Sequence, residues 1–286
     1  MFKKIKSGKI IIRNALRRNA MKFDMHCHTK EGSIDAKVSI EAYINRLVKL
    51  GFDGMLISDH NSYKGYDYYK KIEKNLDLPK DFVVLKGIEY DTLDGGHILV
   101  ILPDDVHSSV LEIRGMRVEG LIRFVHELGG ILGPAHPYGN GFFAFMHTFA
   151  ARRVFGNTEL EPFDFIESFN SCMHPIANKK ARLLALKYKK PTLAGSDAHR
   201  MNIIGTAYTD FLDPITCNND LIAYIKAGKK TVTPTEKDTP DAFVNQRWPI
   251  KHFLIWGYFG YNWLGALFSN RKRKKHPHYI AMNEKK

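Results

Sequence analysis

Short apolar runs alternate with amphipathic segments along most of the chain. The apolar runs, which we assign to strands, cover residues 23–28, 54–58, 82–88, 97–102, 130–135, 163–166, 191–196, 206–211 and 230–233. Helical patterns lie between them, in residues 39–50, 62–75, 118–128, 175–188 and 219–226. Strands that alternate with helices predict βα units and a mostly parallel sheet.

One pair of strands is expected to break this alternation. Asp94, Gly95 and Gly96 form a tight-turn signal between the run that ends at Glu89 and the run that begins at His97. A hairpin at this turn would place His97 beside Glu89, although one residue closes a strand and the other opens one.

Nearly every apolar run has His, Asp or Glu at one end. These residues are His26, His28, Asp59, His60, Glu89, His97, His136, Asp197 and His199. A strand would point His26 and His28 to one face and Cys27 to the other. Because the carboxyl ends of all strands in a parallel barrel meet at one rim, we expect these side chains to converge.

The types of side chain favour particular cations. Neutral imidazoles and carboxylates together suit Zn²⁺, Mn²⁺ or Fe²⁺ better than Mg²⁺ or Ca²⁺, which favour all-oxygen shells. A carboxylate such as Glu89 can bridge two cations, and a water between them would lose its proton near neutral pH and become a nucleophile.

Six short motifs occur in an order that closely resembles one family. HCHT, SDHN, GIE, GHI, AHP and GSDAH span roughly residues 22–200. In this order they resemble the PHP family, named for its polymerase-associated and histidinol phosphatase members. The resemblance implies an α/β fold, a distorted TIM-like barrel of about seven βα units, with two or three divalent metal ions at the carboxyl rim.

The resemblance also implies a ligand set. The first metal would take His26, His28, Glu89 and Asp197, and the second would share Glu89 and add His97 and His136. A third would take His60 and His199. The segment that would supply its remaining ligand departs from the family pattern, because this chain reads HTKEGSIDA where family members often have HTxxSDG. We choose Asp35 as this ligand, and Glu31 is the alternative. A third site that is partly empty is also consistent with this difference.

The implied activity is that of a metal-dependent phosphoesterase, a phosphatase. A small phosphomonoester would be hydrolysed by metal-bound hydroxide at a multinuclear site that contains Glu89 and Asp197. Arg200 is our first candidate for holding the phosphate. Other basic candidates are Lys30, Arg114, Arg117, Arg152 and Arg153. Asp59 and Glu167 are expected to orient metal ligands rather than to bind metal.

Several alternatives differ in substrate or in class. Family members also act on histidinol phosphate, phosphotyrosine and the ends of nucleic acids. His97 and His136 are close in sequence, which leaves no room for the insertion that members with a nucleotide preference often carry. Metal-dependent amidohydrolases share the HxH strand but normally add a bridging lysine, which this chain lacks at its strand ends. A noncatalytic PHP module is disfavoured because the ligand set is nearly complete.

Composition and charge limit the other possibilities. A chain of 286 residues, 44% of them hydrophobic, can bury one barrel-sized core, which we place at residues 22–238. Its three cysteines have no paired spacing, so we expect a reducing cytoplasm. The net charge is +13, but residues 1–22 hold eight basic and no acidic side chains, and residues 269–286 hold seven basic and one acidic. The nearly neutral body does not predict a nucleic-acid binder, although nucleic acid stays open as a partner.

The basic termini predict two appendages. The arm at residues 1–21 mixes apolar with basic residues, and we expect it to be an amphipathic helix. It is not expected to be a signal peptide, because it lacks the apolar core and the cleavage site of one. The tail at residues 239–286 contains the aromatic run 253–268 and a basic cluster at 271–275. That run is shorter than the roughly 20 apolar residues of a membrane span. We hypothesise that arm and tail attach a cytoplasmic enzyme peripherally to an anionic membrane surface. A tail docked on the barrel or a partner is the alternative.

Overall fold

The computed structural model describes residues 20–139, 141–156 and 162–235, together with parts of the segment between 257 and 279. The predicted N-terminal arm lies outside the described residues except at its last two positions, and so does most of the aromatic run 253–268. Within the described part of the chain, no helix has both the length and the apolar character needed to span a bilayer.

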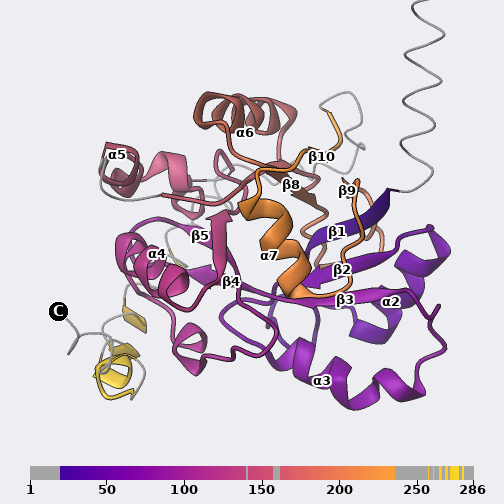
Figure 1. The fold of residues 1–286 in the computed structure, drawn as a ribbon. Coiled ribbons are helices and arrows are strands. Elements are labelled where there is room, and N and C mark those ends of the chain that lie inside the picture. Colours follow the sequence, from indigo (N-terminus) through magenta and orange to yellow (C-terminus); the bar gives the residue numbers. More distant parts are fainter. Residues whose placement is uncertain are drawn as a thin grey trace, which may run out of the picture.

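Strands and helices alternate along the described chain (Figure 1). The strands are β1 (Met21–Cys27), β2 (Gly54–Ile57), β3 (Val83–Lys86), β4 (Ile88–Asp91), β5 (His97–Ile101), β6 (Ile131–Pro134), β7 (Ile166–Asn170), β8 (Thr192–Gly195), β9 (Thr209–Phe211) and β10 (Thr231–Val232). The α-helices are α2 (Ile40–Lys49), α3 (Lys64–Ile72), α4 (Val118–Glu127), α5 (Phe149–Gly156), α6 (Pro175–Tyr188) and α7 (Asn218–Lys226). Short 3₁₀ turns are η1 (Glu73–Asn75), η2 (Ser109–Glu112), η3 (Gly141–Phe143) and η4 (Phe145–His147).

The strands form three hydrogen-bonded sheets. Their orders are β10-β9-β1-β2-β3, β4-β5-β6 and β7-β8. Pairs β1/β2, β2/β3 and β7/β8 are parallel, whereas β4/β5, β5/β6, β1/β9 and β9/β10 are antiparallel. The mixed α/β class is confirmed, and so is the hairpin around Asp94. The expectation of a mostly parallel sheet is wrong, because four of the seven strand pairs among the described residues are antiparallel. A single closed TIM-like barrel of seven units is not seen as one continuous ladder, and it stays a prediction.

Individual hydrogen bonds connect the three sheets where the strands end. The Glu89 amide donates to the Ser58 carbonyl at 3.2 Å, and the Asp197 amide donates to the His26 carbonyl at 2.9 Å. On the far side, the Asp164 amide donates to the Leu132 carbonyl at 2.9 Å. The carboxyl ends of β1, β2 and β8 therefore lie beside β4, as convergence at one rim requires.

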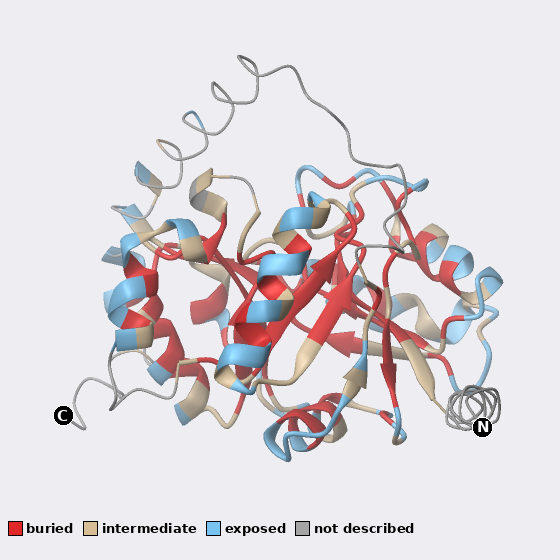
Figure 2. Cartoon of the chain, turned by 90° about the horizontal axis from the view of Figure 1, so that it is seen from above, coloured by how far each residue is buried: buried red, intermediate tan, exposed pale blue. Residues whose placement is uncertain are grey.

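Apolar side chains from the strands fill the interior. This cluster includes Phe23, Met25, Leu56, Leu85, Leu99, Ile131, Leu193 and Phe211, closed by Leu221 and Ile225 of α7. Figure 2 shows buried strands in the centre and helices whose outer faces are exposed. Cys27 packs in a separate cluster with α2, although simple alternation would place it on the face of Phe23 and Met25. The pairing of β1 with β2 shifts register between Asp24 and Cys27, which accounts for the change of face.

Several element predictions are confirmed and others are wrong. Ser39 caps α2 by accepting a hydrogen bond from the Ala42 amide at 3.3 Å, and α6 covers the predicted residues. The strand predicted at residues 163–166 instead begins at Ile166, so Glu167 lies inside β7 rather than after its end. Helix α5 was not predicted from the sequence.

The close contact between β8 and β1 requires a glycine. A Cβ on Gly195 would lie 2.3 Å from the Cβ and backbone nitrogen of His26, a separation that real atoms do not tolerate. Any side chain at this position would push apart the two strands that carry His26 and Asp197.

We expect Gly195→Ala to lower the free energy of unfolding by about 1–3 kcal/mol, because the clash involves backbone that cannot rotate away. Urea unfolding measures the change. Gly156→Ala is the matched control, since a Cβ there meets nothing within 4 Å and should change stability by at most about 1 kcal/mol, in the favourable direction. Equal stability of the two variants would contradict the packing argument.

Candidate metal centre

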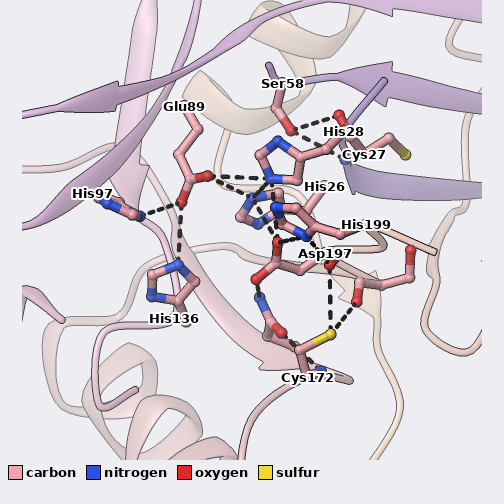
Figure 3. Close-up of polar contacts among 12 residues, drawn as sticks. His26, Cys27, His28, Ser58, Glu89, His97, His136, Cys172, Asp197 and His199 are labelled. Carbon is pink, nitrogen blue, oxygen red and sulfur yellow. Dashed lines mark hydrogen bonds and ion pairs between the residues drawn. The ribbon is translucent and has the colours of Figure 1, made fainter. Parts of the chain in front are cut away.

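The predicted site residues come together where the strands end. Figure 3 shows the Glu89 carboxylate between His97 and His136 on one side and His26 and His28 on the other. Glu89 is 1% exposed, and its Oε1 and Oε2 lie within 3.3 Å of nitrogens on five histidines: His26, His28, His60, His97 and His136. The convergence of residues from β1, β4, β5, β6 and β8 is therefore observed.

The first group consists of His26, His28, Glu89 and Asp197. The two histidine Nε2 atoms are 3.0 Å apart, and they lie 3.3 and 3.2 Å from Glu89 Oε2. Their distances to Asp197 Oδ1 are 3.7 and 3.2 Å. All four side chains are buried, and their donor atoms point at one another.

The second group shares Glu89 with two histidines. His97 Nδ1 lies 3.0 Å from Glu89 Oε1, and His136 Nε2 lies 3.1 Å from the same oxygen. The hairpin brings His97 to this place because it pairs Asp91 with His97, and β6 runs antiparallel to β5, so the chain that follows β6 reaches the same end. One carboxylate thus faces both groups.

A third group lies at the rim. His28, His60 and His199 offer nitrogens within 4.8 Å of one another. Asp35 Oδ2 lies 3.1 Å from His199 Nε2 and 3.7 Å from His60 Nε2, and Asp35 is half exposed. Glu31, the alternative to Asp35, instead accepts a hydrogen bond from the Ile40 amide at the start of α2. Of the two acids, Asp35 is the one beside the histidines.

Sequence reasoning missed Asp91. Its Oδ1 lies 3.4 Å from both His60 Nδ1 and His97 Nε2, and these three residues form a further group with the spacing of a metal site. Asp91 follows Glu89 by two positions on β4, so the strand points both carboxylates to one face. That spacing was the available signal.

Glu167 contacts residues of the centre and belongs to none of the candidate ligand groups, as expected. Its Oε1 lies 2.8 Å from His26 Nδ1, its Oε2 accepts from the His136 amide at 2.5 Å, and Asn170 Nδ2 contacts it at 3.3 Å. Asn170 also donates to Asp197 Oδ2 at 3.1 Å. An acceptor at His26 Nδ1 places the proton on that nitrogen and leaves the Nε2 lone pair directed at the centre.

Asp59, which was expected to orient a metal ligand, reaches an imidazole only through another side chain. Asp59 accepts hydrogen bonds from the Thr29 amide at 2.6 Å, the Thr29 hydroxyl at 2.8 Å and the Ser33 hydroxyl at 3.0 Å. Ser33 Oγ in turn lies 3.2 Å from His28 Nδ1. Asp59 therefore orders the turn after β1 and acts on His28 through Ser33.

The carboxylates of the centre are stabilised in their charged form. Burial raises the pKa of Glu89, but His97, His26 and His60 outweigh it and hold this pKa well below its usual range. Burial also raises the pKa of Asp197, and His26 with the neighbouring histidines again reverses the shift and lowers it.

The imidazoles are shifted in the opposite direction. Burial lowers the pKa of His60, but Glu89, Asp91 and Asp35 raise it to about 10. The pKa of His26 is likewise raised well above its ordinary value, where Asp197, Glu167 and Glu89 overcome burial. At neutral pH the carboxyl groups of Glu89 and Asp197 are already ionised, and the raised pKa values leave the protons on the imidazoles. A divalent cation that binds at the centre would therefore displace protons from the imidazoles and not from these acids.

Backbone strain concentrates at the centre. Among the described residues, four that are not glycine have φ in the left-handed region, and three of them are Asn61, His136 and Asp197, with φ of 46°, 29° and 53°. Each immediately follows or belongs to a predicted site segment. Such conformations persist only where the surrounding structure enforces them, which is typical of functional sites.

The donor set fits a transition-metal ion. At metal–ligand distances of about 2.0–2.1 Å, the edges of a tetrahedral shell measure roughly 3.3–3.4 Å. The five edges recorded for the first group run from 3.0 to 3.7 Å. Asp197 Oδ1 is buried, has no hydrogen-bond partner among the described residues, and faces this point.

A cavity of about 530 Å³ opens beside His60. Its lining includes Asp35 and Asp91, which lie next to the centre, and also Lys64, Glu112 and Arg114. These positions make Lys64 and Arg114 candidates to hold an anion at the centre.

The other basic residues that were predicted to bind phosphate are not among those that line this cavity. Arg200 and Lys30 are exposed after the histidines that they follow. Arg153 pairs with Glu119 at 2.7 Å and with Asp94 at 2.5 Å, and exposed Arg117 lies 3.8 Å from Asp94. Arg152 lines a separate pocket with Phe149 and Tyr188. Arg114 is the one of the named arginines that lines the cavity beside His60.

Comparison with known sequences gives matches over most of the described chain. A model of the PHP domain matches residues 24–164, and a model described as PHP-associated matches residues 175–230. The protein named Uncharacterized protein MJ1587, from Methanocaldococcus jannaschii, is 32% identical over 127 residues, which represent 41% of this chain and 68% of that protein.

Solved structures show a similar fold. The lesion-specific endonuclease PfuEndoQ from Pyrococcus furiosus superposes with a TM-score of 0.56 at 16% identity, over 75% of this chain and 57% of that one. A two-domain protein from Bacteroides vulgatus that contains a predicted PHP-like metal-dependent phosphoesterase gives a TM-score of 0.52 at 16% identity, over 76% and 65%. This chain spans less than two thirds of either protein, and the likeness is one of fold.

Proposed function

This chain belongs to the PHP family, and we propose that it is a metal-dependent phosphoesterase that hydrolyses a small phosphomonoester. The observation that carries the proposal is the first group, in which four buried donor atoms surround one point at the spacing of a metal shell. We assign His26, His28, Glu89 and Asp197 to the first cation.

The other ligand assignments follow the remaining groups. Glu89 would be shared with a second cation held by His97 and His136, and a third would lie among His60, His199 and Asp35. Zn²⁺, Mn²⁺ and Fe²⁺ suit this mixture of imidazoles and carboxylates. Bound cations would supply Lewis-acid activation of water and of the phosphoryl oxygens.

The side chains around the centre have distinct tasks in this proposal. Glu167 and Asn170 fix His26 and Asp197, which keeps two donors aimed at one point. Lys64 and Arg114, which line the same cavity as His60, would hold the phosphate by charge-assisted hydrogen bonds. Arg200 stays a further candidate for this task, since it follows His199 directly. Burial of the centre strengthens each of these interactions.

The size of the cavity and the charge of the body favour a small substrate. A volume of about 530 Å³ suits a small molecule. The nearly neutral body has no large net positive charge to attract the backbone of a long nucleic acid. Structural similarity to endonuclease Q makes a nucleic-acid substrate the alternative to test, and histidinol phosphate and phosphotyrosine belong in the same panel. A noncatalytic role is disfavoured because the acids and imidazoles of the centre are all in place.

We expect the purified protein to contain divalent metal and to release phosphate from monoesters. His26→Ala and Asp197→Ala should each lower turnover by about a thousandfold or more, because each removes charge stabilisation from the transition state. A phosphate-release screen over monoesters, diesters and a duplex DNA with an abasic site would measure activity, with metal analysis and circular dichroism alongside.

His126→Ala is the control for these two variants. His126 lies on α4 and contacts Asp164 at 3.0 Å, outside the three groups, so its removal should leave turnover within a factor of about two. Undiminished phosphate release in both centre variants would rule out the proposed mechanism.

Glu167→Gln should weaken metal binding by roughly 10–100-fold while keeping side-chain volume, because it removes the charged acceptor behind His26. Competition against a chromophoric chelator measures the affinity. Glu127→Gln, an exposed position on α4, serves as the matched control. If both variants bind metal as the parent does, Glu167 has only a packing role.

A further inference from the structure

Arg114 lies in a short loop that joins η2 to α4. The Tyr90 hydroxyl donates to the Ile113 carbonyl at 2.6 Å and accepts from the Met116 amide at 3.0 Å. The Gly115 amide donates to the Asp91 carbonyl at 2.8 Å, and Gly115 has a φ of +88°. The loop is thus tied through its backbone to β4, the strand that carries Glu89 and Asp91.

The C-terminal segment reaches the same loop from about 160 positions away in the sequence. The Arg273 guanidinium donates to the carbonyls of Ile113 at 3.3 Å and Arg114 at 2.5 Å, and His276 Nε2 lies 2.8 Å from the Ser109 hydroxyl in η2. In Figure 1 the yellow C-terminal helix lies against this part of the chain, away from the strands.

Arg273 stands out from the basic cluster around it. It is 2% exposed, whereas Arg271, Lys272, Lys274 and Lys275 are exposed to solvent. Its Nε is buried with no hydrogen-bond partner among the described residues. Burying a guanidinium is costly, and here the compensating contacts are the two carbonyls of the loop.

The C-terminal segment also passes close to the side chain of Arg114. A Cβ built on Gly265 would lie 3.5 Å from Arg114 Nε and 3.7 Å from its Cζ, so the Gly265 backbone runs beside this guanidinium. The segment therefore binds the carbonyl of the arginine that lines the cavity beside His60 and lies near its guanidinium.

We propose that Arg273 is a positioning residue for the substrate cavity. By binding the carbonyls of Ile113 and Arg114, it fixes the loop so that the Arg114 guanidinium stays at the cavity, where it binds the phosphate of the substrate. This inference rests on the proposed function, and it gives the described part of the C-terminal segment a role in substrate affinity without making it a metal ligand.

The experiment uses the full-length, metal-loaded protein and five variants: R114M, R273M, R273K, K272M and the double variant R114M/R273M. Three quantities are measured: KM and kcat with 4-nitrophenyl phosphate, the affinity for inorganic phosphate by calorimetry, and hydrogen exchange of the amides in residues 109–116. Metal content and thermal melting are recorded for each protein. K272M is the matched control, because Lys272 is exposed beside Arg273.

We expect R114M to raise KM and weaken phosphate binding about tenfold or more, since it removes a charge-assisted hydrogen bond. R273M should do the same to an equal or smaller extent, with kcat and metal content within about twofold of the parent and with faster exchange in residues 109–116. Because Arg273 acts through Arg114, the double variant should be no worse than R114M alone. K272M should match the parent.

Additive effects in the double variant, or an unchanged KM in R273M, would overturn the proposal. If R273M does not fold, R273K decides. Both carbonyls accept from the single Nη2 atom of Arg273, and the ammonium of a lysine lies one bond nearer the backbone and falls short of that position. A raised KM at constant kcat supports the proposal, and an unchanged KM overturns it. If the parent releases no phosphate, the proposed function fails, while phosphate affinity and hydrogen exchange still test the role of Arg273.

Discussion

The buried carboxylate of Glu89 is the interaction on which the centre depends. It contacts imidazoles from five positions in the chain and is almost fully excluded from solvent. A charge buried in this way is tolerated only when its surroundings compensate it, so the histidines are as necessary to the fold as to the chemistry. The same histidines keep Glu89 ionised, and its two carboxylate oxygens face two different groups of donor atoms.

The strands place these imidazoles around Glu89 because the backbone adopts a close approach, a tight hairpin and left-handed conformations at particular residues. Gly195 lets β8 approach His26 more closely than any side chain would allow, and the hairpin after Asp91 returns His97 to the end of β4. Left-handed backbone at His136 and Asp197 turns their side chains inward. The strain in these residues is offset by the contacts that the side chains then make.

Sequence reasoning predicted the parts of this structure that local patterns govern. The apolar face of α2, the whole of α6 and the hairpin that brings the His97 side chain beside Glu89 each follow from spacing and turn chemistry. Asp91 was missed because the apolar run was taken to end at Glu89, whereas β4 continues to Asp91. The indirect contact of Asp59 with His28 through Ser33 could not be predicted, because sequence proximity does not give side-chain direction. The division into three sheets depends on strands only two to seven residues long, whose pairing is decided by tertiary packing.

The buried centre and the loops around it differ in how well they would tolerate substitution. Glu89, His26 and Asp197 are buried, and each is held by several partners, so few substitutions there would leave the geometry intact. Arg114 and Arg200 are more exposed and lie on loops, where the chain tolerates change. In the proposed function, the buried centre would carry out the reaction, while the loops and the C-terminal segment would determine which phosphorylated molecule is accepted.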